Sequence, residues 1–483
     1  MTQYDQPIID ITNYIYHPLD PSSPALSAAR TALLDALGCT IQTVSSSAEA
    51  RKLIGPVVNR THVPDGFRLP GTGYRLDPVK GAFDMGVLIR YLDYNDALWG
   101  REWGHPSDNI GAILSVSDWL SRTAKDNKHT GPPLTIRTLL IAITKAYEIQ
   151  GLHQLHNAFN AYGIDHVILV KLASAAVTAW LLGLSQTQAM ATISHVWMDG
   201  HPSRVYRSGS NTIPRKGWAA GDACMRAVHL ALLVRAGQVG AGGALSAVPY
   251  GFLERTFGAR GFVMPQAFGD WAVRNVLFKV MPVEGHGIAA VEAALVQGSR
   301  MRERGLRVEE DIVRVEVRAT AAADLIINKK GVLRNAADRD HCIQYVIAVA
   351  LLKGHAPEVG DYADGSYWAQ SAAMDSMRER IEVMADEGLT KDYLDLEKRS
   401  IGAGLTVYLR DGRVLDEVLV EYPIGHVKNP ATGDAVREKF GRNMRVMFSD
   451  TEIARIIEAV QVDDLRISDF VDLFARDAPE SRL

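Results

Sequence analysis

The stretch Tyr91–Asn109, YLDYNDALWGREWGHPSDN, gathers several side chains that can do chemistry between two apolar runs. It contains Asp93, Asp96 and His105 together with tryptophans, tyrosines and basic residues. A loop that only reverses the chain uses Gly, Asn and Ser, and it needs few large aromatic or ionisable groups. We therefore predict that this stretch is an active-site loop.

Other ionisable residues recur at the junctions between predicted helices and loops. They are His166, Arg204, Arg207, Arg215, Lys216, Lys279 and His286. Such a set suits a polycarboxylate substrate, because cations bind carboxylates and arginine makes forked hydrogen bonds to them. A neutral His or Lys can remove a proton from carbon beside a carboxylate, and a protonated partner can donate to a leaving hydroxyl. Each residue also has a purely structural explanation, such as a helix cap for Asp93 or a solvated strand residue for Lys279.

The loop at 200–216, GHPSRVYRSGSNTIPRK, crowds positive charge into a short segment. Like charges so close together are costly without a counter-anion. We therefore expect this loop to bind an anion.

Composition excludes several classes of protein. The chain has 483 residues, of which 47% are hydrophobic, and 52 basic against 56 acidic residues give a net charge of −4. The chain has no long run of charged residues of one sign, so neither nucleic acid nor an anionic membrane is expected as a partner. No apolar run reaches the roughly 20 residues that cross a bilayer. The N-terminus resembles neither a secretory signal nor a transit peptide, so we expect an intracellular, cytoplasmic protein. The last residues, Ser481-Arg482-Leu483, resemble a peroxisomal address and give a peroxisomal alternative.

The three cysteines, Cys39, Cys224 and Cys342, are far apart and form no C-x-x-C. We expect small buried hydrophobic residues in a reducing compartment, with neither a disulfide framework nor an iron–sulfur cluster. No phosphate loop, G-x-S-x-G or H-E-x-x-H motif occurs. We predict no metal and no other cofactor.

The first half of the chain is predicted to be helix after helix. Candidate N-caps are Asp77 before a proline, Ser107, Asp165, and Ser185 with Gln188 as a capping box. Small residues dominate 219–227, which suits a helix packed closely against its neighbours.

The pattern changes near Asn275. Residues 276–283 favour a strand or an extended connector, 312–320 alternate like a half-buried strand, and 368–385 read as an amphipathic helix. Asp411-Gly412 between two alternating runs predicts a β-hairpin. The fold class is therefore mainly α: a large all-helical domain at 1–275, an inserted or following smaller α+β domain at 276–430, and C-terminal helices at 431–483 that can rejoin the first domain.

Long motifs along the chain resemble the MmgE/PrpD family, and within it the dehydratases of 2-methylcitrate. The matching segments cover nearly the whole chain. They are LDALGC (34–39), RYLDYND and WGHPSDN (90–109), KAYEIQG (145–151), GIDHVILVKLASAAV (163–177), RKGWAAGDA (215–223), NVLFK (275–279), NKKG and ADRDHCIQY (328–345), and VEYPIGH (420–426).

The resemblance implies one helical domain built from both ends of the chain, 1–275 and 431–483, with the smaller α+β domain as a lid. It also implies a homodimer that carries its active sites in the clefts between domains. It implies a dehydratase that needs no iron–sulfur cluster and acts on a tricarboxylate. The expected reaction eliminates water from a 2-alkylcitrate, most simply 2-methylcitrate, giving 2-methyl-cis-aconitate. By the same resemblance, His105, His166 and Asp93 handle protons, and Lys216 and Lys279 bind carboxylates. Arg207 and Arg215 would assist them.

The chain also departs from the family pattern. Ala97 stands where members commonly have Thr, and Gly285 replaces an aromatic residue beside His286. These losses predict a larger, more apolar pocket that admits a longer alkyl tail. The alternatives are a dehydratase of a longer 2-alkylcitrate in secondary metabolism, a cis-aconitate decarboxylase, and a dimer that binds tricarboxylates without catalysis.

Overall fold

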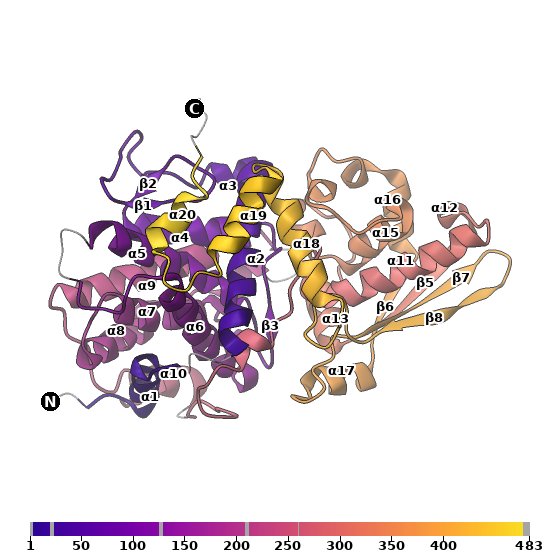
Figure 1. Ribbon diagram of the computed structural model, residues 1–483. Helices are drawn as coiled ribbons and strands as arrows, with labels where there is room; N and C mark the ends of the chain where they lie inside the picture. Colours follow the sequence, from indigo (N-terminus) through magenta and orange to yellow (C-terminus); the bar gives the residue numbers. More distant parts are fainter. Residues whose placement is uncertain (1–2, 20–23, 125–128, 208–211, 259, 477–483) are drawn as a thin grey trace.

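The computed structural model describes residues 3–19, 24–124, 129–207, 212–258 and 260–476. Figure 1 shows a large helical lobe beside a smaller lobe that combines helices with a sheet. Each lobe is built around its own hydrophobic cluster. The chain is mainly helical, which confirms this part of the predicted fold class.

The large lobe consists of helices from both ends of the chain. The helices from the first part are α1 (Gln6–Tyr16), α2 (Pro24–Ser46), α3 (Ala48–Arg51), α4 (Pro78–Arg90), α5 (Ile110–Thr123), α6 (Ile136–His156), α7 (Val167–Leu181), α8 (Gln186–Met198), α9 (Ala219–Arg235) and α10 (Phe252–Phe257). Two short antiparallel pairs join them, β1 (Phe67–Arg68) with β2 (Arg75–Leu76) and β3 (Leu98–Trp99) with β4 (Trp103–Gly104). The helices from the C-terminal part are α18 (Thr432–Met444), α19 (Asp450–Ala459) and α20 (Ile467–Asp472).

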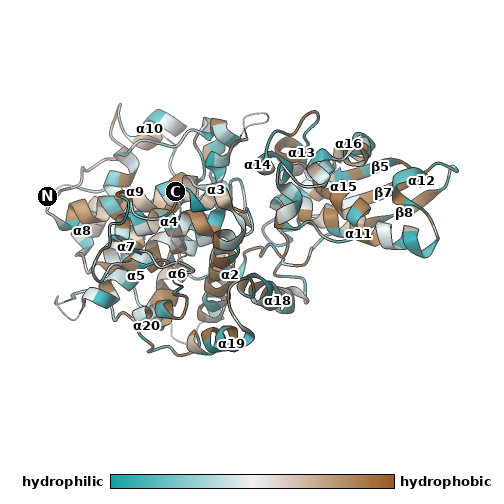
Figure 2. Ribbon diagram, turned by 90° about the horizontal axis from the view of Figure 1, so that it is seen from above, coloured by the Kyte–Doolittle hydropathy of each residue, from teal (hydrophilic) through white to brown (hydrophobic). Residues whose placement is uncertain are grey.

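The C-terminal helices return to the large lobe. Helix α18 packs against α2 and α20 against α5, and Phe440, Ile456 and Phe470 belong to the same hydrophobic cluster as the first helices. In Figure 2, hydrophobic and hydrophilic residues alternate around α18 and α19, as expected for helices with one face on a core.

A four-stranded sheet forms the centre of the small lobe. Its strands are β5 (Ile312–Ala319), β6 (Ile381–Ala385), β7 (Ala403–Leu409) and β8 (Val414–Val420), in the order β6-β5-β7-β8. The β5–β6 pair is parallel, whereas β7 pairs antiparallel with β5 and with β8. The helices of this lobe are α11 (Ile288–Glu303), α12 (Val308–Asp311), α13 (Ala321–Ile327), α14 (Ala336–Arg339), α15 (Ile343–Lys353), α16 (Ala372–Glu379) and α17 (Glu387–Leu394).

The sheet confirms two sequence predictions and corrects a third. The strand at 312–320 and the hairpin around Asp411-Gly412 are present, and Gly412 takes the left-handed conformation (φ +86°) that the turn requires. The amphipathic helix predicted over 368–385 is wrong in its second half. Helix α16 ends at Glu379, and the next residues form β6, because they pair with β5 at the edge of the sheet.

Small residues allow three helices of the large lobe to approach closely. A Cβ on Gly86 of α4 would lie 2.6 Å from the Cα of Gly221 in α9, and a Cβ on Gly111 of α5 would lie 2.9 Å from the backbone of Gly86. The close packing predicted for 219–227 is therefore confirmed. It fixes α4 and α9, whose ends carry residues of the candidate site.

Local helix starts follow the predicted caps in most cases. The Asp77 side chain accepts from the backbone of Val79, and Ser185 with Gln188 forms the capping box. Asp165 accepts from the backbone of Val167 at 3.2 Å. Ser107 does not cap a helix: it lies inside a 3₁₀ turn, Pro106–Asn109, and its hydroxyl donates to Asp96.

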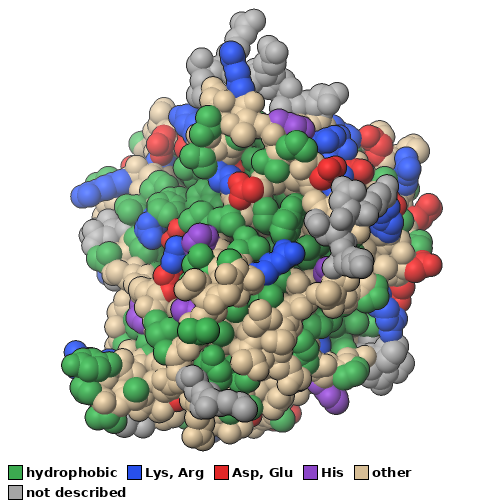
Figure 3. All heavy atoms as spheres, turned by 90° about the vertical axis from the view of Figure 1, so that its left-hand side faces the viewer, with side chains coloured by type: hydrophobic (Ala, Val, Ile, Leu, Met, Phe, Trp, Pro, Cys, Tyr) green, Lys and Arg blue, Asp and Glu red, His purple; other side chains and the backbone are tan. Residues whose placement is uncertain are grey.

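The end of the large lobe carries exposed hydrophobic side chains, whereas the three cysteines lie inside the protein. Figure 3 looks at the end of the large lobe, where hydrophobic side chains cover a wide area between scattered charged groups. Cys39, Cys224 and Cys342 are all free and buried, as predicted. Within the described ranges, no helix is both long and apolar enough to span a bilayer. Residues Ser481–Leu483, which carry the peroxisomal prediction, lie outside the described residues.

Candidate active site

Asp93 lies three residues beyond the end of α4, in a buried cluster of charge. Its backbone is left-handed (φ +52°), which turns the chain back beside the helix. One carboxylate oxygen pairs with Arg90, and the other accepts from the Lys279 Nζ at 2.8 Å. Burial raises the pKa of Asp93, but Arg90 and Lys279 outweigh this effect and hold it well below its usual range. Asp93 is therefore a stable anion that holds two cations in place.

His105 lies at the start of the 3₁₀ turn, on the far side of the predicted loop. Its Nδ1 is 2.6 Å from the carbonyl oxygen of Asp96. A carbonyl only accepts, so Nδ1 carries the hydrogen and Nε2 keeps its lone pair. Burial, followed by the charges of Arg90 and Lys279, lowers the pKa of His105 well below its usual value. The ring is therefore neutral, with a free basic nitrogen.

His166 faces His105, and the centroids of the two rings are 5.8 Å apart. It directly precedes α7 and follows Asp165, with 3.3 Å between His166 Nδ1 and Asp165 Oδ1. Neither ring nitrogen has a hydrogen-bond partner among the described residues, although the ring is buried. Burial lowers the pKa of His166 well below its usual value, and Asp165 opposes this shift without cancelling it. A buried imidazole without a hydrogen-bond partner is free to bind a ligand.

Arg207 reaches the cluster through Asp165. Its Nε donates to Asp165 Oδ2 at 2.7 Å, and Arg204 lies 3.7 Å from the same oxygen. Burial raises the pKa of Asp165, but Arg207 and its neighbours lower it well below its usual range. The carboxylate therefore links the positive loop to His166.

Lys216 connects the two lobes. Its Nζ donates to both carboxylate oxygens of Asp340, at 2.8 and 3.0 Å, and lies 3.1 Å from the Nδ1 of His341. Burial lowers the pKa of Lys216, and Asp340 works against that shift. Burial and the charge of Lys216 also lower the pKa of His341. The cation that sequence reasoning assigned to a substrate carboxylate is thus held by a protein carboxylate in this structure.

The positive loop at 200–216 is compensated from within the protein. Arg204 and Arg207 face Asp165, Lys216 faces Asp340, and residues 208–211 lie outside the described residues. The argument from uncompensated charge is therefore wrong for these cations, because carboxylates distant in sequence neutralise them.

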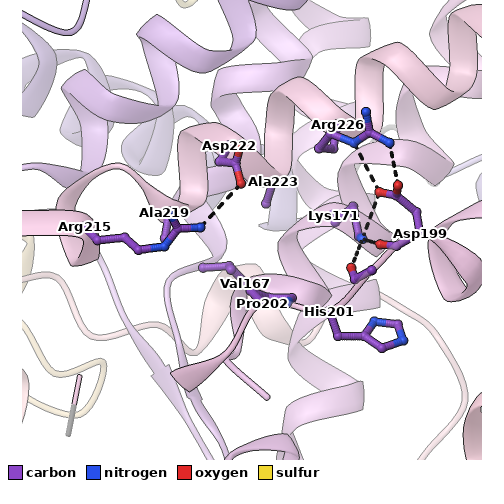
Figure 4. A pocket seen from close by; sticks show the side chains of 11 residues that line it. Val167, Lys171, Asp199, His201, Pro202, Arg215, Ala219, Asp222, Ala223 and Arg226 are labelled. Atoms are coloured by element: carbon purple, nitrogen blue, oxygen red, sulfur yellow. Dashed lines mark hydrogen bonds and ion pairs between the residues drawn. The ribbon is translucent and has the colours of Figure 1, made fainter. Parts of the chain in front are cut away.

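Arg215 does not join the cluster. Its guanidinium lies over the ring of Trp218, 4.1 Å from the centroid, and 3.9 Å from Asp222. In Figure 4 it points towards Asp222 in a separate pocket of about 310 Å³, across from the ion pairs that Asp199 makes with Lys171 and Arg226. Of the proposed site residues, Arg215 is thus the one turned away.

The space beside His286 is filled. A Cβ on Gly285 would lie 2.3 Å from the indole of Trp103, and that indole packs on His286 with 4.2 Å between ring centroids. Ala97 is fully buried and its backbone pairs with Leu277. The larger pocket expected at Gly285 is therefore not found, because a tryptophan from the active-site loop replaces the missing ring.

Sequence reasoning missed Arg90, Asp340 and His341. Arg90 was hidden in the last turn of an apolar helix, where a basic residue is ordinary. Four consecutive ionisable residues at 338–341, directly before an apolar run, were a usable signal for the other two. The assembled site thus combines cations, carboxylates and two neutral histidines in a buried junction between the lobes.

The chain belongs to the MmgE/PrpD family. The model of the MmgE/PrpD N-terminal domain matches residues 11–264, and the model of the C-terminal domain matches residues 281–465. The resemblance seen in the sequence is thereby confirmed.

Similar proteins include two described as alkylcitrate dehydratase. One, from a fungal species, is 60% identical over 477 residues, covering 98% of this chain and 94% of the relative. The other, from Talaromyces stipitatus, is 56% identical over 480 residues, covering 98% of each chain. The 2-methylcitrate dehydratase of Escherichia coli K12 is 42% identical over 478 residues, again covering 98% of each.

Proposed function

We propose that this protein is a hydro-lyase that eliminates water from a 2-alkylcitrate, with no iron–sulfur cluster. The observation that carries the proposal is the buried pair of neutral histidines, His105 and His166, surrounded by cations. The names of the relatives support the substrate class, since alkylcitrate and 2-methylcitrate dehydratases match the chain over its whole length.

The cations supply the binding of the three carboxylates. Lys279, Arg90 and Lys216 are buried around Asp93, and Arg207 pairs with Asp165 next to His166. Charge-assisted hydrogen bonds in a water-poor site are stronger than those at a surface. Substrate carboxylates would compete with Asp93 and Asp340 for these donors.

The proton steps follow from the tautomer of His105. Its Nε2 takes the proton from the carbon beside a substrate carboxylate, and the electrons of the C–H bond form the new C=C bond. The C–O bond breaks, and the hydroxyl leaves as water after it receives a proton. His166 supplies that proton after it has taken one up from solvent on substrate binding, because the negative charge of the bound substrate raises the pKa of a nearby imidazole. Over the elimination His105 gains one proton and His166 loses one, so the step balances.

The role proposed for Asp93 is to position a neighbouring cation. Its carboxylate is engaged by Arg90 and Lys279, and its lowered pKa makes it a weak base. We infer that it orients Lys279 for a substrate carboxylate.

The test measures dehydration by the ultraviolet absorbance of the conjugated acid product. Purified protein is incubated with citrate, 2-methylcitrate or 2-hexylcitrate, and the variant His105→Asn is compared with wild type. Loss of one general base is expected to lower kcat by about 10²–10⁴-fold. His153→Gln is the matched control, since His153 is equally buried but bonds to the carbonyl of Ile149 away from the cluster.

Other outcomes separate the alternatives. Release of carbon dioxide from cis-aconitate, without dehydration of a citrate, would assign the site to decarboxylation. Tricarboxylate binding without turnover of any substrate would leave a binding protein. Full activity in His105→Asn would remove His105 from the mechanism.

We also propose the domain layout and assembly that the sequence predicted. The two hydrophobic clusters support one domain of residues 1–275 with 431–483 and a lid of residues 276–430. The hydrophobic area in Figure 3 supports a homodimer, because monomers rarely expose large apolar patches. Light scattering after size exclusion would then give twice the chain mass of 52.9 kDa. The cytoplasmic or peroxisomal location stays a prediction.

A further inference from the structure

A cavity of about 490 Å³ lies between the two lobes, beside the candidate site. The large lobe contributes Tyr91 and Leu92, and the small lobe contributes Pro282, Ala337 and Val359. Most of the wall is apolar, and the volume is within the range of about 300–1,000 Å³ that holds small organic ligands.

The cavity runs from the site to the surface. Lys216, Asp340 and Tyr362 line it and are at most 7% exposed, whereas the lining residues Glu49 and Gly365 are exposed. Lys216 therefore belongs both to the cavity and to the cluster of charged groups around Asp93. A substrate whose carboxylate reached Lys216 would have an apolar passage next to it.

We propose that this cavity is the subsite for the 2-alkyl substituent of the substrate, and that it binds an unbranched chain of several carbons. The proposal rests on the function proposed above. It replaces the expectation that the chain would fit at Ala97 and Gly285, because neither residue lines the cavity and Trp103 fills the space at Gly285.

Other cavities fit an alkyl chain less well. The pocket in Figure 4 is lined by Lys171, Asp199, Arg215, Asp222 and Arg226, which suits polar groups. A further cavity in the small lobe has Lys329, Lys330 and Arg378 in its lining and does not include a residue of the candidate site. An alkyl chain gains free energy only where apolar surface leaves water.

The experiment measures kcat/KM for 2-methylcitrate, 2-propylcitrate and 2-hexylcitrate with wild-type protein. We expect kcat/KM to rise roughly fourfold per methylene while the chain enters the apolar wall. Ala337→Phe and, separately, Val359→Phe should lower the ratio of hexyl to methyl activity at least tenfold. The ratio is measured within one protein, so a partly folded variant lowers both activities and leaves the ratio unchanged.

Ala372→Phe is the matched control, because Ala372 is an exposed alanine of α16 that does not line the cavity. It should keep the wild-type ratio. Wild-type protein that dehydrates 2-methylcitrate but gains nothing from longer chains would overturn the subsite and leave the proposed function intact. An unchanged ratio in both cavity variants would overturn it as well. Wild-type protein that dehydrates none of the three would overturn the proposed function, and the subsite with it.

Discussion

The Lys439–Asp35 pair and the Lys279–Asp93 pair are alike in geometry and opposite in electrostatics. Their N–O distances are 2.7 and 2.8 Å, and all four side chains are at most 1% exposed. Burial raises the pKa of Asp35 in spite of Lys439, whereas Arg90 as a second cation brings the pKa of Asp93 well below its usual range. A buried ion pair therefore does not mark a site.

The surroundings of the two lysines explain the difference. Lys439 also donates to the carbonyl of Tyr94 at 2.7 Å and lies over its ring, so its hydrogen bonds join α18 to the rest of the large lobe. Lys279 lies among further cations and the neutral His105. Two cations that share one carboxylate beside the Nε2 of a neutral His105 are what distinguish the candidate site.

The largest expected effect is on stability at the structural pair. Lys439→Met leaves Asp35 buried without its cation, and we expect the free energy of unfolding to fall by about 3–5 kcal/mol. Urea denaturation measures it, and the double variant Asp35→Leu/Lys439→Met should recover part of the loss. A fall in kcat/KM with unchanged stability would contradict the structural role.

The next effect is on activity at the candidate site. Lys279→Met should lower kcat/KM by about 10²–10³-fold, the size seen when one stabilising donor is removed. Its effect on stability should be smaller than that of Lys439→Met, because Arg90 still pairs with Asp93. Steady-state kinetics and urea denaturation of the same preparation decide this. A Lys279→Met protein that unfolds easily but keeps wild-type kcat/KM would make the two pairs equivalent.

The smallest expected effect is on the pH dependence of stability, and it concerns His153, a buried histidine outside the candidate site. Burial lowers the pKa of His153 to about 4, against about 6.5 for an unfolded histidine. Below pH 6.5 the unfolded chain therefore binds a proton that the folded protein does not, and stability is lost as the pH falls towards 4. His153→Gln removes this loss, so the variant should gain about 2 kcal/mol relative to wild type between pH 7 and pH 5.

Urea denaturation at the two pH values measures the gain. Equal pH dependence in both proteins would mean that folding does not lower the pKa of His153.

Much of the local structure was predictable because it depends on neighbouring residues. The alternation at 312–320, the Asp411-Gly412 turn and the caps at Asp77 and Ser185 each lie within a few positions in the sequence. Strand β6 was missed because its pairing with β5 comes from about 66 residues away, where Val315 faces Ile381. No local period encodes that partner.

The residues of the candidate site also fall into those that local sequence predicts and those that depend on distant contacts. His105, His166 and Lys279 carry recognisable local motifs, and the structure brings them together. The contact of Lys216 with Asp340 and the filling of Gly285 by Trp103 depend on packing between segments far apart in sequence. The expectation of a larger pocket failed for that reason: a missing side chain predicts a space only if nothing else can enter it.

The chain passes between the lobes twice, and the two passages touch. The amide of Phe278 on the way out donates to the carbonyl of Gly425 on the way back, at 3.0 Å. Gly425 has φ +106°, and a Cβ there would lie 1.8 Å from the carbonyl oxygen of Phe278, so only glycine permits the contact. The same glycine thus ties the outgoing segment to the returning one directly beside Lys279, since residue 279 follows Phe278 in the chain.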